Sequence, residues 1–148
     1  MKRIILMTVI LAAMSISCDN DDSPNVETPS VVLNTFQREF PDATDVEWEK
    51  LQQDYEVEFE VDNIDHTAIL SNDGNLLKYK YDILISELPG PITAIINTNY
   101  ESNEIDDTEI LIIDGVTYYQ VEFERTLKDE QVVFNVSGEV NPDIEYLD

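Results

Sequence analysis

The 148-residue chain has one cysteine, one histidine and four glycines, and each scarcity excludes a class of site. A single cysteine cannot form a disulfide within the chain. The chain has no zinc-ligand spacing and no glycine loop that could cradle a phosphate. A serine or cysteine nucleophile needs a neighbouring base, and His66 is predicted in a surface turn between two strands. The sequence therefore predicts no catalytic residue, no metal centre and no cofactor.

Basic side chains are also scarce, at 8 Lys and Arg against 32 Asp and Glu, a net charge of −24. This charge repels phosphate backbones and anionic lipid surfaces, which excludes nucleic-acid binding and direct membrane binding. Basic proteins, basic peptides and cations remain as partners. The simpler alternative is that the acidic excess only keeps an extracytoplasmic domain soluble.

The chain has no apolar run long enough for a transmembrane helix, since its longest stretch, Ile4 to Ala13, is too short. Two basic residues precede this stretch, and a small residue stands directly before Cys18. The pattern predicts a lipoprotein signal peptide over residues 1–17, with Cys18 acylated after cleavage. An ordinary secretory signal followed by a chance cysteine is the alternative. Acyl chains would provide the membrane anchor that the acidic surface cannot.

Residues 18–28 contain Asp19, Asp21 and Asp22 and few apolar side chains, which predicts a disordered acidic tether. The tract resembles the surface-export signal of lipoproteins from the Bacteroidetes. We expect an exported protein anchored to the cell envelope at the outer membrane, on its periplasmic side or on the cell surface.

The chain contains one unit written twice. Tyr55–Glu60 returns 64 positions later as Tyr119–Glu124, and the register holds as far as Gly74 and Gly138. Two units follow, over residues 29–85 and 86–148.

Each unit begins with a helical pattern and continues with strands. Apolar residues recur at helical spacing over residues 29–40, end at Pro41, and recur again after Pro89. Period-two alternation then predicts strands at 46–49, 55–62, 67–71, 76–83, 108–113, 117–125, 131–136 and, as a short last strand, 139–147. The fold class is α+β, a tandem repeat of one helix plus about four antiparallel strands, with the helices packed on one face of the sheet.

The other face of the sheet is predicted to be acidic and open, and it is the candidate surface for a protein or peptide partner. Like charges across a strand pair cost up to about 1 kcal/mol each, which Lys50, Lys78 and Lys80 are expected to relieve in part. Tyr118 points away from Tyr119 and adds an aromatic contact. The candidate partner-binding residues are Glu47, Glu49, Glu56, Glu58, Glu60, Tyr118, Glu122 and Glu124.

Three loops supply oxygen donors for calcium, at residues 62–65, 72–75 and 103–107. None has the spacing of a twelve-residue calcium loop, and turn chemistry explains the first two. Calcium is therefore a candidate partner without a motif.

The ordered motifs Phe36-x-x-x-Phe40-Pro41, Trp48-Glu49, Tyr55-x-Val57-x-Phe59, Asp73-Gly74 and Glu87-Leu88-Pro89 resemble the PepSY-like, β-lactamase-inhibitor-like family of bacterial secreted proteins and lipoproteins. The resemblance implies tandem helix-plus-four-strand repeats forming a concave sheet that grips a protein or peptide. The second unit departs from the motif, since Glu101 replaces the proline and no tryptophan matches Trp48.

Two functions of different class remain. The first is a non-enzymatic, lipid-anchored binding module, inhibitor-like or otherwise, that engages a protein or peptide through the open sheet. The second is an acidic cation-binding or structural envelope lipoprotein without a specific protein partner.

Overall fold

The structure, a computed structural model, describes residues 26–100 and 104–148. The predicted signal peptide, Cys18, most of the tether and Glu101 lie outside the described residues. Within them no helix is both long enough and apolar enough to cross a membrane.

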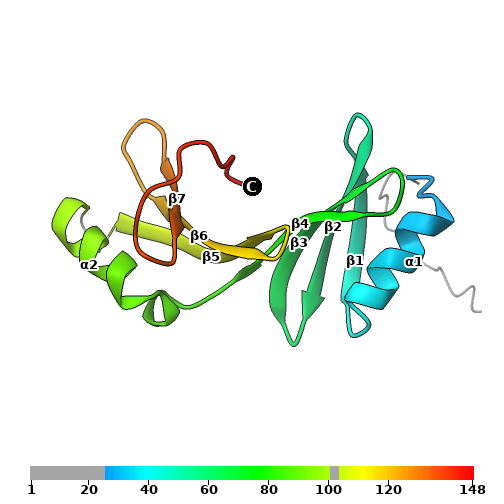
Figure 1. Cartoon of the computed structure of the whole chain (residues 1–148), viewed down its shortest axis with the longest axis horizontal. Helices are drawn as coiled ribbons and strands as arrows, with labels where there is room; N and C mark the ends of the chain where they lie inside the picture. Colours follow the sequence, from blue (N-terminus) through cyan, green and yellow to red (C-terminus); the bar gives the residue numbers. More distant parts are fainter. Residues whose placement is uncertain (1–25, 101–103) are drawn as a thin grey trace, which may run out of the picture.

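The described residues form two α-helices, a short 3-10 helix and seven strands. In chain order these are α1 (Ser30–Glu39), β1 (Thr44–Lys50), β2 (Asp54–Val61), β3 (Ile64–Ser71), β4 (Leu76–Asp82), η1 (Ile85–Glu87), α2 (Gly90–Asn99), β5 (Ile105–Ile113), β6 (Val116–Phe123) and β7 (Glu130–Asn135). The strands form one antiparallel sheet in the order β1 to β7, so each strand pairs with its neighbour in sequence (Figure 1). The predicted fold class is confirmed.

Each helix buries an apolar stripe against its own half of the sheet. Val32 and Phe36 of α1 pack on a cluster that includes Val57 of β2. Ile92 and Ile96 of α2 pack on β6 and β7. The strand register places both helices on the same sheet face, since Val57 aligns through successive strand pairs with the α2-facing side chains. The two helices lie at opposite ends of an elongated molecule (Figure 1).

One glycine in each unit lies against the first turn of the helix of that unit. Gly74 has φ +79°, and a Cβ there would lie 2.7 Å from the Val31 side chain. Gly138 has φ +88°, and a Cβ there would lie 3.0 Å from the carbonyl oxygen of Pro91. Both the positive φ and the close approach require glycine. The repeated glycine thus allows each helix to dock closely on its sheet.

The predicted last strand at 139–147 is wrong. Val140 forms only an isolated bridge to Phe134, and the amide of Asn141 donates to the carbonyl of Val133 at 2.8 Å. Pro142 has no amide proton to continue the pairing. Residues 141–148, called the strap below, instead leave the sheet and turn back over its helix-free face (Figure 1).

Candidate binding face

Five glutamates predicted to bind a partner lie together on the helix-free surface of β1 and β2, and this surface is called the acidic face. In the strand register Glu47 pairs with Glu58 and Glu49 pairs with Glu56. Glu60 pairs with Asp65 of β3. Glu47, Glu49 and Glu58 are exposed, while Glu56 and Glu60 are half-buried.

A groove at one end of the acidic face is lined mainly by acidic side chains. Its walls include Glu47, Glu58, Glu60 and Asp65, and Thr67 also lines it. A partner side chain that entered this groove would therefore meet carboxylates on both sides.

The expected relief of this charge by lysines is wrong for Lys50. Lys50 lies on the helix side of the sheet, where its Nζ donates to the Tyr55 hydroxyl at 2.8 Å. Lys80 is on the helix-free face but is bound to Glu109, with its Nζ 2.6 Å from Oε1. Lys78 lies opposite Ile69 on the same face as the glutamates. No ion pair among the described residues involves the five glutamates of the acidic face.

The crowding of these carboxylates changes the titration of Glu56. Burial raises the pKa of Glu56 above its ordinary value, and the charges of Glu49 and Glu58 raise it further. Lys80 and Lys78 lower it in part. Glu56 is therefore ionised at a cost, which a basic partner would reduce.

The predicted site residues of the second unit are not joined to the acidic face. Tyr118 does point to the helix-free side, but it is half-buried and packs in a cluster with Leu111 and Leu147. Glu122 accepts a hydrogen bond from Gln131 at 2.8 Å. Glu124 is exposed and lies after the end of β6. Whether any of these residues contacts a partner stays a prediction.

A buried polar network under the strap was not predicted. Glu109 is 1% exposed and Gln120 is fully buried. The Gln120 Nε2 donates to Glu109 Oε2 at 2.7 Å and to the Leu147 carbonyl at 2.9 Å, and the Leu147 amide donates to Gln120 Oε1 at 3.0 Å. The sequence held one signal for it, because Gln120 replaces the acid that Glu56 provides 64 residues earlier.

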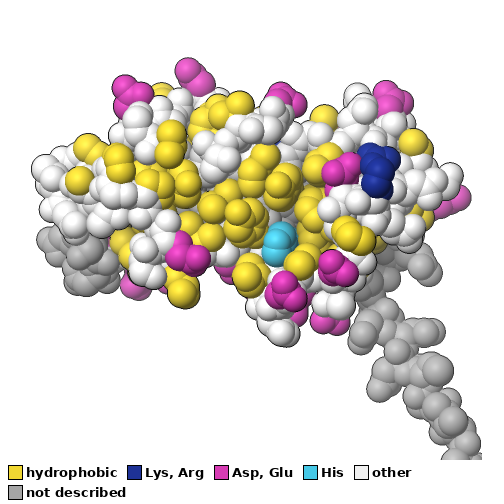
Figure 2. All heavy atoms as spheres, turned by 60° about the horizontal axis from the view of Figure 1, so that its bottom comes forward, with side chains coloured by type: hydrophobic (Ala, Val, Ile, Leu, Met, Phe, Trp, Pro, Cys, Tyr) yellow, Lys and Arg dark blue, Asp and Glu magenta, His cyan; other side chains and the backbone are white. Residues whose placement is uncertain are grey.

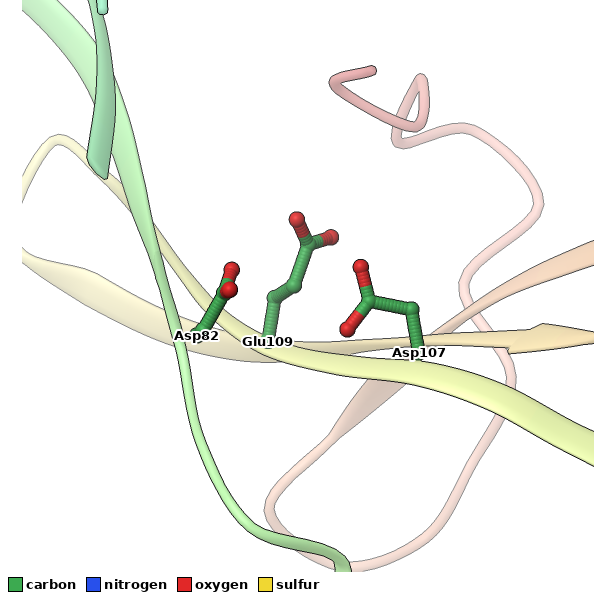
Figure 3. A group of neighbouring side chains, drawn as sticks. All are labelled: Asp82, Asp107 and Glu109. Atoms are coloured by element: carbon green, nitrogen blue, oxygen red, sulfur yellow. The ribbon is translucent and has the colours of Figure 1, made fainter. Parts of the chain in front are cut away.

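Three carboxylates of β4 and β5 converge beside this network. The oxygens of Asp82, Asp107 and Glu109 lie within 4.8 Å of one another, the one such acidic group in the described part of the chain (Figure 3). Burial and, to a smaller extent, the charges of Asp107, Glu109 and Asp65 together raise the pKa of Asp82 from 3.8 to about 6, against the opposing effect of Lys80. Because Glu109 already accepts from Lys80 and Gln120, an ammonium group supplies the positive charge at this cluster.

Two of the predicted calcium loops form hairpin turns. Asp62 and Asn63 both have positive φ between β2 and β3, and Gly74 has positive φ between β3 and β4. Such turns favour Asn, Asp and Gly whether or not a metal binds. The third loop lies partly outside the described residues and partly in β5. Calcium binding therefore stays a prediction.

His66 lies in β3 and not in a turn, so that prediction is wrong. Its ring stacks between Phe59 and Tyr81 on the helix side of the sheet, at centroid distances of 5.1 and 5.3 Å. Figure 2 shows hydrophobic side chains gathered around the histidine across the middle of the molecule, between the ends that carry α1 and α2. The ring therefore belongs to a row of stacked aromatic side chains.

Comparison with known proteins identifies the family. The model of the family described as "Putative beta-lactamase-inhibitor-like, PepSY-like" matches residues 14–78 and again residues 71–141. The chain belongs to this family, and the double match agrees with the repeat seen in the sequence. No curated protein matches the chain.

Two solved structures have a similar fold. A "putative periplasmic" protein from Bacteroides eggerthii has a TM-score of 0.71 at 15% identity, over 76% of this chain and 85% of that chain. A BLIP-like protein from Bacteroides fragilis has a TM-score of 0.69 at 21% identity, over 82% of this chain and 89% of that chain. At these identities the likeness shows the fold alone.

Proposed function

We propose that the chain is a non-enzymatic, lipid-anchored module outside the cytoplasm that binds a basic protein or peptide through the acidic face. The observation that carries the proposal is the direct opposition of Glu47 to Glu58 and of Glu49 to Glu56 with no ion-pair partner among the described residues. Opposed like charges cost up to about 1 kcal/mol for each pair, and a complementary basic surface would remove that cost on binding.

The family and the fold support the class and the compartment. The family name refers to inhibitor-like proteins, which act by binding, and the similar Bacteroides eggerthii structure is described as periplasmic. The lysine-arginine start, the apolar stretch and Cys18 support export and acylation, and the acidic tract after Cys18 supports an outer-membrane location.

A capture experiment tests the proposal. The soluble chain from residue 24 is immobilised and exposed to envelope extract in low and high salt. We expect saturable, salt-sensitive capture of one basic protein that is lost when Glu47→Gln and Glu58→Gln are combined. The matched control combines Asp42→Asn and Asp73→Asn, which removes the same charge from exposed positions off the acidic face. Equal loss in both variants would contradict a specific acidic face.

The rival function, cation binding without a protein partner, predicts a different result in the same protein. In that case no protein is captured, and calcium raises the melting temperature of the wild type more than that of Asp82→Asn. The ammonium of Lys80 at the carboxylate cluster argues against this outcome.

A further inference from the structure

The strap makes contacts of the kind that a bound peptide makes with a receptor. The Gln120 side chain forms a two-point hydrogen-bond pair with the backbone of Leu147, at 2.9 and 3.0 Å, in place of a neighbouring strand. Leu147 is 6% exposed and packs in a cluster with Ile69 and Leu111. Ile144, three residues earlier, packs against the same cluster. The backbone of the strap is thus held by the amide side chain of Gln120. Its apolar side chains pack on an apolar floor formed by Ile69 and Leu111.

The strap follows a course that no segment of the first unit follows. The first unit ends in a fourth strand, β4, at the positions 64 residues before those of the strap, and Glu56 stands at the position equivalent to Gln120. The family match to the second unit ends at residue 141, where the strap begins. The strap therefore takes the place in the second unit that the fourth strand, β4, has in the first.

The charges around the strap oppose its docking. It carries Asp143, Glu145 and Asp148. The face beneath carries Asp82, Asp107, Glu109 and Glu122, while Lys80 is already bound to Glu109. Burial and the charges of Glu109 and Glu122 raise the pKa of Tyr146 in the strap. A basic segment would complement this surface better than the acidic strap does.

A path leads to this site from the acidic face. A groove of about 610 Å³ lies beside the strap and is lined by Leu147 together with Leu51, Asp54, Glu56, Ile69 and Lys78. Glu56 belongs to the acidic face and Ile69 to the floor beneath Leu147. A segment bound at the acidic face would reach the apolar floor through this groove.

We propose that the surface beneath the strap is a peptide-binding site, which residues 141–148 occupy as an internal ligand. The partner that displaces them is a lysine- or arginine-bearing peptide with two apolar side chains three residues apart. This inference rests on the proposed function and names its partner class and its regulation. A peptide can bind this surface only while the strap is open. Its apparent association constant therefore equals the intrinsic constant multiplied by the fraction of molecules in which the strap is open.

The probe is a fluorescein-labelled peptide with the order of residues 141–148 in which Asp143, Glu145 and Asp148 are each replaced by lysine. It is titrated by fluorescence anisotropy into the chain from residue 19 onward, which keeps every described residue. Leu147→Ala loosens the strap, and we expect it to bind the peptide roughly tenfold more tightly than the wild type. The matched control is Leu127→Ala, whose leucine is 99% exposed, and its affinity should equal that of the wild type.

Hydrogen exchange distinguishes displacement from binding elsewhere. In the wild type we expect the amides of residues 144–148 to exchange faster when the peptide is bound, because the strap has left Gln120. If the peptide binds while these amides stay protected, the inference is wrong. The proposed function survives that result if binding is lost when Glu47→Gln and Glu58→Gln are combined.

Two other results would overturn the inference. Dimers of Leu147→Ala in size-exclusion chromatography, without peptide binding, would make a second copy the occupant of the site. An absence of peptide binding to folded wild type and folded Leu147→Ala would show that the strap is only a structural cover. The proposed function would then still be tested independently by the capture experiment.

Discussion

Replacement of Asp82 by asparagine should stabilise the protein at neutral pH. The pKa of Asp82 rises from 3.8 to about 6, a change of 6 − 3.8 = 2.2, because burial and the charges of Asp107, Glu109 and Asp65 disfavour its ionised form. At about 1.4 kcal/mol per pKa unit this corresponds to roughly 3 kcal/mol. Asp82 is only half-buried, so solvent screening reduces the expected gain to about 1–1.5 kcal/mol for Asp82→Asn at pH 7.

The sign of the pH dependence follows from the raised pKa of Asp82. Between pH 4 and pH 6 the folded state binds more protons at Asp82 than the unfolded state, so this group lowers the free energy of unfolding as the pH rises. Asparagine cannot ionise, so the variant lacks this part of the pH dependence. The stability difference between the two proteins should therefore be largest above pH 6 and should vanish near pH 4.

Urea unfolding followed by circular dichroism at pH 4, 5, 6 and 7 measures this difference. Asp42→Asn serves as control, because Asp42 is exposed in a turn. An Asp82→Asn variant that is less stable than the wild type at pH 7 would refute the crowding of charge around Asp82. A variant whose gain in stability is the same at every pH would refute it as well.

Three further predictions concern the repeat, the core and the anchor. Gly74→Ala should lower the free energy of unfolding in urea by at least about 1 kcal/mol more than Gly115→Ala does, because both glycines have positive φ but only Gly74 lies against Val31. Equal losses in the two variants would contradict this packing. Phe134→Ala should lower the free energy of unfolding by about 3–5 kcal/mol, because the side chain is fully buried, and a loss below about 1 kcal/mol would contradict its place in the core. Cys18→Ser should move the protein from the membrane fraction to the soluble fraction on immunoblots, and unchanged fractionation would refute acylation.

The helix positions and the strand faces could be predicted from the sequence, because local periodicity determines them. The first helical pattern ends at Phe40 and Pro41, and the observed α1 ends at Glu39. Tyr119 and Val121 alternate with Tyr118 and Gln120, and the structure places the two pairs on opposite faces. Period-two alternation was sufficient here because each strand has one buried side.

The course of the strap could not be predicted, because alternation in residues 139–147 does not reveal whether the partner of the backbone is a strand or a side chain. The partner of Leu147 is the amide group of Gln120, 27 residues earlier. The cluster of Asp82 with Asp107 depends on the pairing of β4 with β5, which joins the two units. Non-local pairings of this kind are invisible to a local pattern.

The face on which Lys50 lies, by contrast, could have been predicted from local alternation. Alternation in β1 places Lys50 with Trp48, on the face opposite Glu47 and Glu49. Proximity in the sequence suggested a neutralising partner, but the pleat directs the ammonium to Tyr55 on the helix side. The acidic face is therefore more nearly free of positive charge than composition alone indicated.

The most direct test of the account is carbodiimide cross-linking of the captured partner, followed by mass spectrometry. Carbodiimide joins a carboxylate to a lysine that it contacts. We expect cross-links from Glu47, Glu49 or Glu58 to lysines of the partner, and their loss in high salt. Cross-links confined to carboxylates outside the acidic face and the strap groove would contradict it.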